Sequence, residues 1–540
     1  MKRYLFVLAT FIGILLAWSF PSSVTPASAA GVIKMQITSD TGIGNPILNK
    51  AVPMVGYLAF DPLVEFNDQG KLVPSLAKSW DFADDNKTIT FHLHSNVKWQ
   101  DGKPFTAADV DFTLNTILDS KTLTPQRTNL KVGDKTVSWK VVDNETITFS
   151  LPEPYAPFMF NLSGIKIIPK HLLSASADIN KDPFNLNPIG TGAYKVTEWQ
   201  QGSHIVLTAF KDYFAGAPQG DKFVLQYFAD QDAAAAALEK GELDLKWIAP
   251  EQQERFLKNP KFKVLKYVYY TPITLAFNHK HPVLKDRQVR QAIGYAIDKR
   301  SLMNTVTKGL GKVANYQYSD GGTLDFYNNY ALSEDVYDPA RARRLLEEAG
   351  WKDIDGDGIL KKDGEKLSLT ITTWSGFAEY ENVCTIVQEM LKKVGIQTEV
   401  KLIARSGLEE MRYDVKADPK GRALEVQEWP HPFRFDPDLY RELHSSAVPP
   451  SGDNYMWYNN PQVDELLAKG RTTMDPEKRR EIYLKLQEIL KEDRPSIPLY
   501  IAVDAYAVAE YVGGVPDDTP NVQQFVFIYP EKLFVKKKTS

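Results

Sequence analysis

The stretch LAFNHKHPVLKDRQVRQAIGYAIDKRSLMNTVTK, from Leu275 to Lys308, carries most of the information about the fold. It begins inside an apolar, strand-like run that contains Ile273, Leu275 and Phe277. After Asn278 and a proline, apolar residues recur at the spacing of one helical face, at Val289, Ala292, Ile293, Ala296 and Ile297. The pattern therefore predicts a strand that leads into an amphipathic helix.

Strand and helix signals alternate along the rest of the chain. Ile89, Phe91 and Leu93 alternate with polar residues, which indicates a strand with one buried face. Thr106 and Asp109 have the spacing of a helix capping pair, and Asp-Pro pairs at 338–339 and 475–476 are typical helix starts. This alternation predicts an α/β protein, and a length of 540 residues suggests about three domains.

The sequence motifs in several separate stretches resemble those of one known family. The pattern "LAFN…P…D.RVRQAI.YAID" in the first stretch, "GTG.Y" at 190–194, "NP.VDELL" at 460–467 and the residues 483–500 are similar to the extracellular solute-binding proteins of family 5. Those proteins capture peptides, nickel and other solutes for ABC importers. The resemblance covers nearly all of residues 32–535, so it is far more specific than one motif.

The resemblance implies a two-lobed periplasmic-binding-protein (Venus flytrap) α/β fold with an extra subdomain inserted in the first lobe. The first lobe would span residues 30–272 and include the inserted subdomain at about 50–187. The second lobe would span 273–497, and residues 498–540 would return to the first. The chain would cross between the lobes near 269–277 and 497–507, and the lobes would close over a solute. A monomer that delivers its solute to an ABC permease and ATPase is the implied assembly.

The first 29 residues read as a cleaved signal peptide. Lys2 and Arg3 precede an apolar run from Tyr4 to Phe20, and small residues end at Ala29. An uncleaved anchor is the alternative, but Thr10, Gly13 and Ser19 interrupt a run that is short for a membrane span. No cysteine follows the run, so the lipid-anchoring cysteine of many relatives is absent. We therefore expect a periplasmic protein.

Net charge and cysteine content limit the possible ligands and the possible covalent cross-links. The formal net charge is −4, and loss of Lys2 and Arg3 would make it −6, so nothing attracts nucleic acid or an anionic membrane. Cys384 is the only cysteine, which excludes an intrachain disulfide. It lies beside an apolar helical stripe and is expected to be a core residue.

The identity of the solute is less well defined. Peptide-binding relatives commonly carry a "D-x-x-[DE]-P" element whose first Asp pairs with the peptide α-ammonium. Here the corresponding residues end in Asp436-Pro437, and Phe433 stands where that Asp would be. Arg434 is instead suited to a carboxylate or phosphate, since a guanidinium offers a planar fork. An oligosaccharide or another non-peptide solute is therefore an alternative ligand.

Aromatic side chains are the other candidates for ligand contacts. Flat rings that order few torsions make good walls for extended ligands, although large aromatics are more often core residues. We predict ligand contacts from Trp374, which ends the strand 367–373, from Trp429 and Trp457, and from Asp40 in the polar turn after the first strand.

Two patterns suggest metals. Asp353, Asp355 and Asp357 alternate ahead of Gly358 like the start of a calcium loop, but the twelfth position is Gly364 and the expected carboxylate is displaced to Glu365. An acidic turn is the alternative to calcium. The pairs His92/His94 and His279/His281 have the minimum spacing for a metal pair, without a third ligand nearby.

No enzyme signature stands out. The chain contains no HExxH, no GxSxG and no phosphate-binding glycine loop, so we expect no catalytic residues and no enzyme. A secreted glycoside hydrolase is the strongest alternative from another class, because carboxylates and aromatics are abundant. A solute receptor that serves a sensor rather than a permease is a third interpretation.

Overall fold

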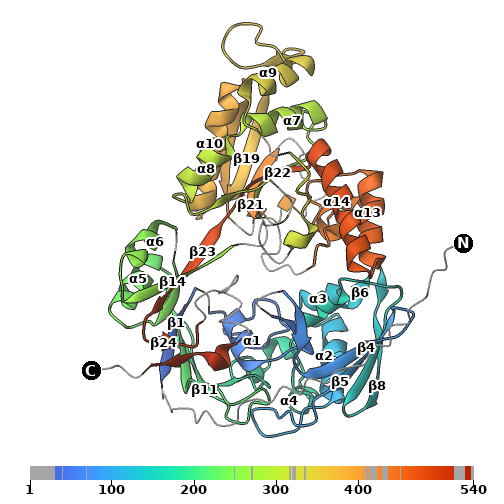
Figure 1. Cartoon of the computed structure of the whole chain (residues 1–540), viewed down its shortest axis with the longest axis vertical. Helices are drawn as coiled ribbons and strands as arrows, with labels where there is room; N and C mark the ends of the chain where they lie inside the picture. The colour runs from blue at the N-terminus through green and yellow to red at the C-terminus, as the bar shows by residue number, and fades with distance from the viewer. Residues whose placement is uncertain are drawn as a thin grey trace, which may run out of the picture.

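A computed structural model describes residues 31–38, 40–67, 70–248, 250–268, 272–315, 318, 324–333, 336–376, 378–404, 407–408, 411–412, 423–428, 436–449, 452–515 and 529–536. Two bodies lie one above the other in Figure 1, and strands of the chain connect them at one side. The lower body is lobe I with an inserted subdomain, and the upper body is lobe II. The predicted two-lobed α/β architecture is thus confirmed.

The stretch from Leu275 to Lys308 forms the strand and the helix that its pattern predicts. All five residues of strand β15 (Ile273–Phe277) are buried. Asp286 caps helix α7 (Arg287–Ala296) by accepting the amide of Gln288 at 2.9 Å. Ile297 falls just outside the helix, because its backbone is extended and a second helix, α8 (Lys299–Val306), starts behind the Asp298 cap. Ile297 is nevertheless buried, so its apolar side chain still packs in the core of lobe II.

Lobe I is built on a seven-stranded sheet. Its strands follow the order β10 (Tyr194–Gln200), β11 (His204–Ala209), β12 (Lys222–Tyr227), β1 (Val32–Ile37), β13 (Leu245–Ile248), β23 (Val503–Ala509) and β14 (Phe262–Val268). Helices α5 (Gln231–Glu239) and α6 (Pro250–Leu257) pack on one face through a small apolar cluster. The chain ends in η6 (Pro530–Lys532) and the strand pair β24 (Val512–Gly513) and β25 (Phe534–Val535).

The inserted subdomain occupies the sequence between β1 and β10, which lie in the same sheet. Its four-stranded sheet has the order β4 (Ala77–Phe82), β5 (Thr88–Leu93), β9 (Thr146–Ser150) and β8 (Ser138–Asp143). Asp109 accepts the amide of Thr106 at 2.9 Å, so the predicted capping pair at the start of helix α2 (Ala107–Leu118) is confirmed. The smaller elements are α1 (Pro53–Ala59), β2 (Val64–Phe66), β3 (Leu72–Pro74), η1 (Gln126–Leu130), β6 (Lys131–Val132), β7 (Lys135–Thr136), α3 (Phe158–Ser163), α4 (Lys170–Leu173), η2 (Ile179–Lys181) and η3 (Pro183–Asn185).

Lobe II has a six-stranded sheet with helices around it. The strand order is β16 (Lys312–Val313), β22 (Ser496–Ile501), β15, β21 (Leu424–Glu428), β19 (Ser368–Trp374) and β20 (Gln397–Ile403). Its longer helices are α9 (Pro339–Glu348), α10 (Ala378–Lys393), α13 (Pro461–Thr472) and α14 (Pro476–Asp493), and Asp338 and Asp475 cap α9 and α14 as predicted. The remaining elements are η4 (Asp325–Tyr327), β17 (Lys361–Lys362), β18 (Glu365–Lys366), α12 (Tyr440–Leu443) and η5 (Ser445–Ala447).

The chain passes between the two large sheets twice. The first crossing leads from β14 to β15, and the second leads from β22 to β23, which only Ala502 separates. The expected boundary at 497 falls inside β22, because this strand stays in the lobe II sheet up to Ile501. No turn residue marks the change of sheet, since the backbone is extended on both sides of it.

One charged side chain is buried under α5 and α6. Lys246 of β13 is fully buried beside Ala507, and its ammonium donates to the side-chain oxygen of Gln252 at 3.3 Å. The Gln252 amide in turn donates to Asp232 at 2.7 Å. Burial lowers the pKa of Lys246 to about 8, and the carboxylate of Asp232 only partly opposes this. The charged form of Lys246 is therefore a cost to the folded state.

We predict that Lys246→Met stabilises the protein at pH 7. The folded pKa lies below the unfolded value of 10.5, so the buried charge costs about 3 kcal/mol below pH 8, and this cost disappears as the pH rises toward 10.5. Because Gln252 loses a partner, we expect a net gain of about 1–2 kcal/mol in the free energy of unfolding. Denaturant titrations of the variant and the unmodified protein at pH 7 and pH 10 measure the difference in the free energy of unfolding. This difference should be smaller at pH 10. Lys240→Met, at an exposed position, is the control and should change little.

Candidate ligand-binding site between the two sheets

The carboxyl ends of the lobe I strands meet at one edge of their sheet. Strands β12 and β13 both run parallel to β1, and β14 has the same direction because both it and β13 are antiparallel to β23. Strand β14 is also the strand that leaves for lobe II. This edge, where β1 ends at Ile37, therefore faces the other lobe.

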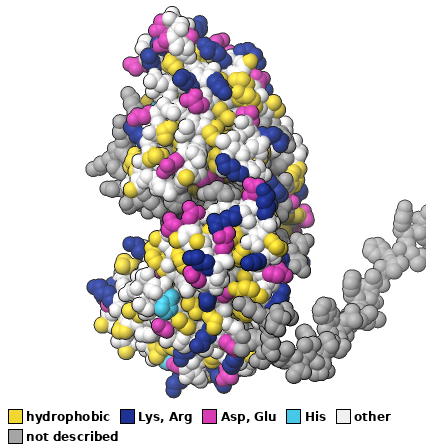
Figure 2. All heavy atoms as spheres, turned by 90° about the vertical axis from the view of Figure 1, so that its left-hand side faces the viewer, with side chains coloured by type: hydrophobic (Ala, Val, Ile, Leu, Met, Phe, Trp, Pro, Cys, Tyr) yellow, Lys and Arg dark blue, Asp and Glu magenta, His cyan; other side chains and the backbone are white. Residues whose placement is uncertain are grey.

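The lobe II sheet turns an equivalent edge toward lobe I. Strand β15 enters from lobe I at Ile273, which pairs with Glu428 at the end of β21 and with Tyr500 near the end of β22. Strand β19 is parallel to β21 and ends at Trp374. In open α/β sheets, ligands bind at the carboxyl ends of the strands. Figure 2 shows the surface hollowed between the upper and the lower part, and the candidate site lies between these two edges.

A buried ion pair supports the wall of this site in lobe II. The guanidinium of Arg412 pairs with the carboxylate of Glu425 in β21, and their side chains are 10% and 2% exposed. The same guanidinium lies 4.6 Å from the ring centroid of Tyr455 and 5.6 Å from that of Trp374. Because charge and rings are removed from water together, the pair holds Trp374 in place at the edge of the sheet.

The sequence patterns did not identify Arg412 and Glu425. Strand β21 reads LEVQE, and this alternation predicts a solvent-exposed Glu425, whereas the structure buries Leu424, Glu425 and Val426 alike. A carboxylate at such a position requires a cation or a hydrogen-bond donor. The sequence did not show which cation supplies it, since Arg412 lies in a different segment.

Asp40 lies just after β1, at the edge of lobe I that faces lobe II. Its carboxylate accepts three hydrogen bonds from its own lobe: from the indole of Trp199 at 3.0 Å, from the amide of Gly202 at 2.8 Å and from the amide of Gly42 at 3.1 Å. These bonds tie the loop after β1 to the turn between β10 and β11. Asp40 thus shapes this edge, and direct contact with a ligand stays a prediction.

Of the other three predicted ligand residues, only Trp457 lies in the described ranges. It has a left-handed backbone (φ 56°), and the ammonium of Lys280 lies 2.9 Å from its ring centroid. Lys280 follows the end of β15 that is farther from lobe I, so Trp457 lies toward that end of the strand, and its contact with a ligand stays a prediction. Trp429 and Arg434 lie outside the described residues, although Trp429 follows β21 directly in the sequence.

The acidic turn at 353–358 brings its three carboxylates together. One oxygen each of Asp353, Asp355 and Asp357 lies within 4.8 Å of the others, the only such group of three metal-binding residue types in the described part of the chain. The buried ammonium of Lys361 pairs with Asp355 and, at 3.0 Å, with Asp357, while the guanidinium of Arg343 lies 3.7 Å from Asp353. Side-chain cations of the protein therefore neutralise these carboxylates, and calcium binding stays a prediction.

The two histidine pairs do not converge on a common point. His92 bonds to Asp81 at 3.0 Å on the solvent face of β5, while His94 contacts the ring of Phe214. Burial lowers the pKa of His279 to about 3, so its imidazole is neutral against Tyr458. The ring of His281 is buried and accepts the amide of Val283 at 3.3 Å. In the described part of the chain, no group of three possible metal ligands includes any of these histidines.

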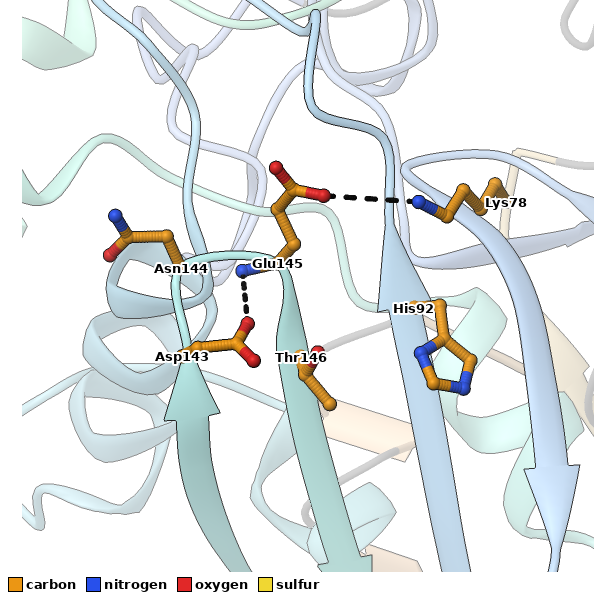
Figure 3. A pocket seen from close by; sticks show the side chains of 6 residues that line it. All are labelled: Lys78, His92, Asp143, Asn144, Glu145 and Thr146. Atoms are coloured by element: carbon orange, nitrogen blue, oxygen red, sulfur yellow. Dashed lines mark hydrogen bonds and ion pairs between the residues drawn. The ribbon is translucent and has the colours of Figure 1, made fainter.

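A pocket on the inserted subdomain is separate from the candidate site. It is lined by Lys78 of β4, His92 of β5 and the residues Asp143, Asn144, Glu145 and Thr146 around the turn between β8 and β9 (Figure 3). Lys78 and Glu145 form an ion pair of 3.8 Å whose side chains are about half exposed. Such a pair is screened by solvent and contributes little, so we treat the pocket as polar surface.

Two α/β lobes, two crossings of the chain between them and facing carboxyl edges define the class of two-lobed solute-binding proteins. Residues 71–464 match the family model described as bacterial extracellular solute-binding proteins, family 5 Middle. The oligopeptide-binding protein AppA of Bacillus subtilis is 32% identical over 452 residues, which cover 82% of this chain and 80% of AppA. The chain therefore belongs to family 5 of the bacterial extracellular solute-binding proteins, and it is a solute-binding protein.

Solved structures agree with this assignment. The structure of B. subtilis AppA with a nonapeptide has a TM-score of 0.79 at 28% identity and covers 94% of this chain and 100% of AppA. The structure of NikZ from Campylobacter jejuni with Ni(L-His) has a TM-score of 0.79 at 27% identity, with 93% and 99% covered. Among the helices in the described ranges, none is long and apolar enough to cross a membrane.

We predict that millimolar CaCl₂ leaves the melting temperature of the protein unchanged, because the ammonium of Lys361 repels Ca²⁺ from the three carboxylates. Lys361→Met removes the competing cation, so this variant should gain calcium-dependent stabilisation. Thermal melts with CaCl₂ and with EDTA compare the two proteins. A calcium-dependent shift in the unmodified protein would show that Lys361 moves aside for the ion.

Proposed function

We propose that this protein is the peptide-capturing receptor of an ABC importer, exported by a cleaved signal peptide to the periplasm. The main support for the proposal is the pair of facing carboxyl edges, joined by two crossings of the chain, in a member of the solute-binding family. A solute that contacts both edges binds the closed form more tightly and thus shifts the lobes toward closure. The closed receptor then presents both lobes to a membrane permease, while an ATPase supplies the energy.

Peptide is the solute class that the relatives favour. AppA is described as oligopeptide-binding, and its solved complex contains a nonapeptide. A long peptide suits a site whose wall includes the flat ring of Trp374 beside a buried guanidinium. Because Phe433 replaces the acidic residue that commonly holds a peptide α-ammonium, we propose that recognition depends on the peptide chain and its side chains rather than on its amino terminus.

The receptor releases its solute chemically unchanged under this proposal. A test incubates the protein separately with an oligopeptide mixture, an oligosaccharide mixture and Ni²⁺ with histidine. Native mass spectrometry detects the retained ligand, and liquid chromatography detects any product. Peptide retention without a product supports the proposal. Retention of sugar or of the nickel complex alone would replace peptide as the solute, and a hydrolysis product would establish an enzyme.

We predict that Trp374→Ala weakens peptide binding at least about tenfold, because truncating an aromatic side chain in a binding wall commonly costs 2 kcal/mol or more. Trp457→Ala is the matched control: both rings are half-buried, but Trp457 packs under Lys280 away from the facing edges. Isothermal titration calorimetry with a peptide from the retention experiment measures both. Equal losses in the two variants would show that Trp374 is no special part of the site.

A related prediction concerns Trp429, which directly follows β21. Trp429→Ala should weaken peptide binding and leave the melting temperature of the empty protein nearly unchanged, because a ligand wall contributes little to folding. Calorimetric binding and thermal melts of the same preparation decide the question. A large fall in the melting temperature would show instead that Trp429 is a core residue.

A further inference from the structure

Lobe II touches the inserted subdomain at a place remote from the crossing strands. In Figure 1 the crossings lie on one side of the molecule, while α13 and α14 descend toward β4 and β6 on the other side. The space between the lobes is thus bounded by the crossings on one flank and by this second contact on the other. The second contact involves α12 and α13 of lobe II, and η1 and the loop before α3 of the subdomain.

The first part of the contact is a backbone hydrogen bond between the lobes. The amide of Ala156, just before α3, donates to the carbonyl of Arg471 at 2.8 Å. Arg471 lies in the last turn of α13, where carbonyls have no partner within the helix. The carbonyl of Gly470, its neighbour, is satisfied inside lobe II by Arg479 at 2.8 Å. The Arg471 carbonyl therefore obtains from the subdomain a donor that an open form would have to replace with water.

The side chain of Arg471 forms the second part. It bonds to Asp438 at 2.8 Å, and its guanidinium lies 3.8 Å from the ring centroid of Tyr440, both within lobe II. Tyr155 of the subdomain lies 5.5 Å from the same guanidinium. Tyr155 is only 5% exposed, and burial raises its pKa to about 12. One cation thus approaches an aromatic ring of its own lobe and one of the opposite lobe.

A third contact lies nearby. The guanidinium of Arg441 in α12 donates to the hydroxyl of Thr128 in η1 at 3.4 Å. Asp453 pairs with the same guanidinium from within lobe II and so orients it. Both arginines are therefore positioned by carboxylates of lobe II before they meet the subdomain.

We propose that Tyr155, Ala156 and Thr128 of the inserted subdomain form a latch with Arg471 and Arg441 that stabilises the closed arrangement independently of the solute. Rotation about the crossing strands separates the lobes most on the flank opposite the crossings, so opening breaks these contacts. Since they need no ligand, they raise the fraction of empty protein that is closed. Observed affinity scales with the fraction of protein in the binding-competent state, so the latch tunes affinity without touching the solute. The inserted subdomain would thereby act as the partner of lobe II in closure.

The test measures closure of the empty protein, so it does not depend on which solute is bound. Fluorescent labels at Asp84→Cys, in the exposed β4–β5 turn, and at Arg344→Cys, exposed on α9, report the distance between the lower and upper bodies. The native Cys384 does not interfere, since it is fully buried and burial raises its thiol pKa to about 12. Single-molecule energy transfer then gives the closed-to-open ratio.

The decisive comparison is Tyr155→Ala against Tyr440→Ala. Each variant removes one aromatic ring from Arg471, but only Tyr155 belongs to the opposite body. We expect Tyr155→Ala to lower the closed-to-open ratio about fivefold and Tyr440→Ala to leave it nearly unchanged. An unchanged ratio in Tyr155→Ala, or equal falls in both variants, would overturn the latch.

Thr128→Val keeps the inference testable if Tyr155→Ala fails to fold. It removes only the hydroxyl that accepts from Arg441, at an exposed position, so the fold should tolerate it. We expect a fall of about twofold in the closed-to-open ratio. No change in this variant would contradict the contribution of Thr128. A negative result for the latch would not contradict the proposed peptide capture, because the retention experiment detects bound ligand and does not measure closure of the empty protein.

Discussion

The structure depends on one constraint: the chain passes twice from a strand of one large sheet to a strand of the other, from β14 to β15 and from β22 to β23. The amides and carbonyls of a strand must be paired where water is excluded, and β22 and β23 meet this requirement in different sheets with only Ala502 between them. Together with the step from β14 to β15, this arrangement places the carboxyl edges of both sheets toward each other. A pivot between rigid bodies and a ligand site then arise at the same place, because the strands that connect the lobes also form the edges.

Buried charge is handled locally in each body, which keeps the bodies rigid while their relative position changes. In lobe II, Arg479 and Asp436 pair through two hydrogen bonds of 2.7 Å, and Arg412 pairs with Glu425. Breaking such a pair costs several kcal/mol because it strands a charge. In lobe I, the hydrogen-bond partner of Lys246 is a neutral glutamine. Burial of this incompletely neutralised charge lowers the pKa of Lys246 and destabilises the folded state. The contacts between lobe II and the subdomain are weaker in kind, since they consist of single hydrogen bonds and a distant ring, and such contacts suit an interface that opens.

The candidate site illustrates how far local patterns reach. Trp374 could be placed from the sequence because it ends a strand with clear alternation, and the chain of capping residues at Asp338 and Asp475 placed whole helices correctly. Asp40 was found for its turn, and the structure places it at the proper edge, although its oxygens are engaged by Trp199, Gly202 and Gly42. Trp457 lies beside Lys280, toward the end of β15 that is farther from lobe I, a position that depends on where the segment after β15 packs. The acidic turn matches a metal pattern, but two of its carboxylates pair with Lys361, a residue outside the matched positions.

The class of the protein follows from its amino-acid sequence. Strand and helix periodicity depend on neighbouring residues, so β15, α7 and most caps could be predicted, and family motifs spread over nearly the whole chain implied the two-lobed fold. The folded chain was needed to show which side chains meet, such as Arg412 with Glu425 and Tyr155 with Arg471. It was also needed to show in which sheet each end of the β22–β23 stretch lies. The physical reason is that these contacts join segments far apart in the chain. A local pattern indicates which face of a helix or strand is buried, but it does not identify the residues that pack against that face.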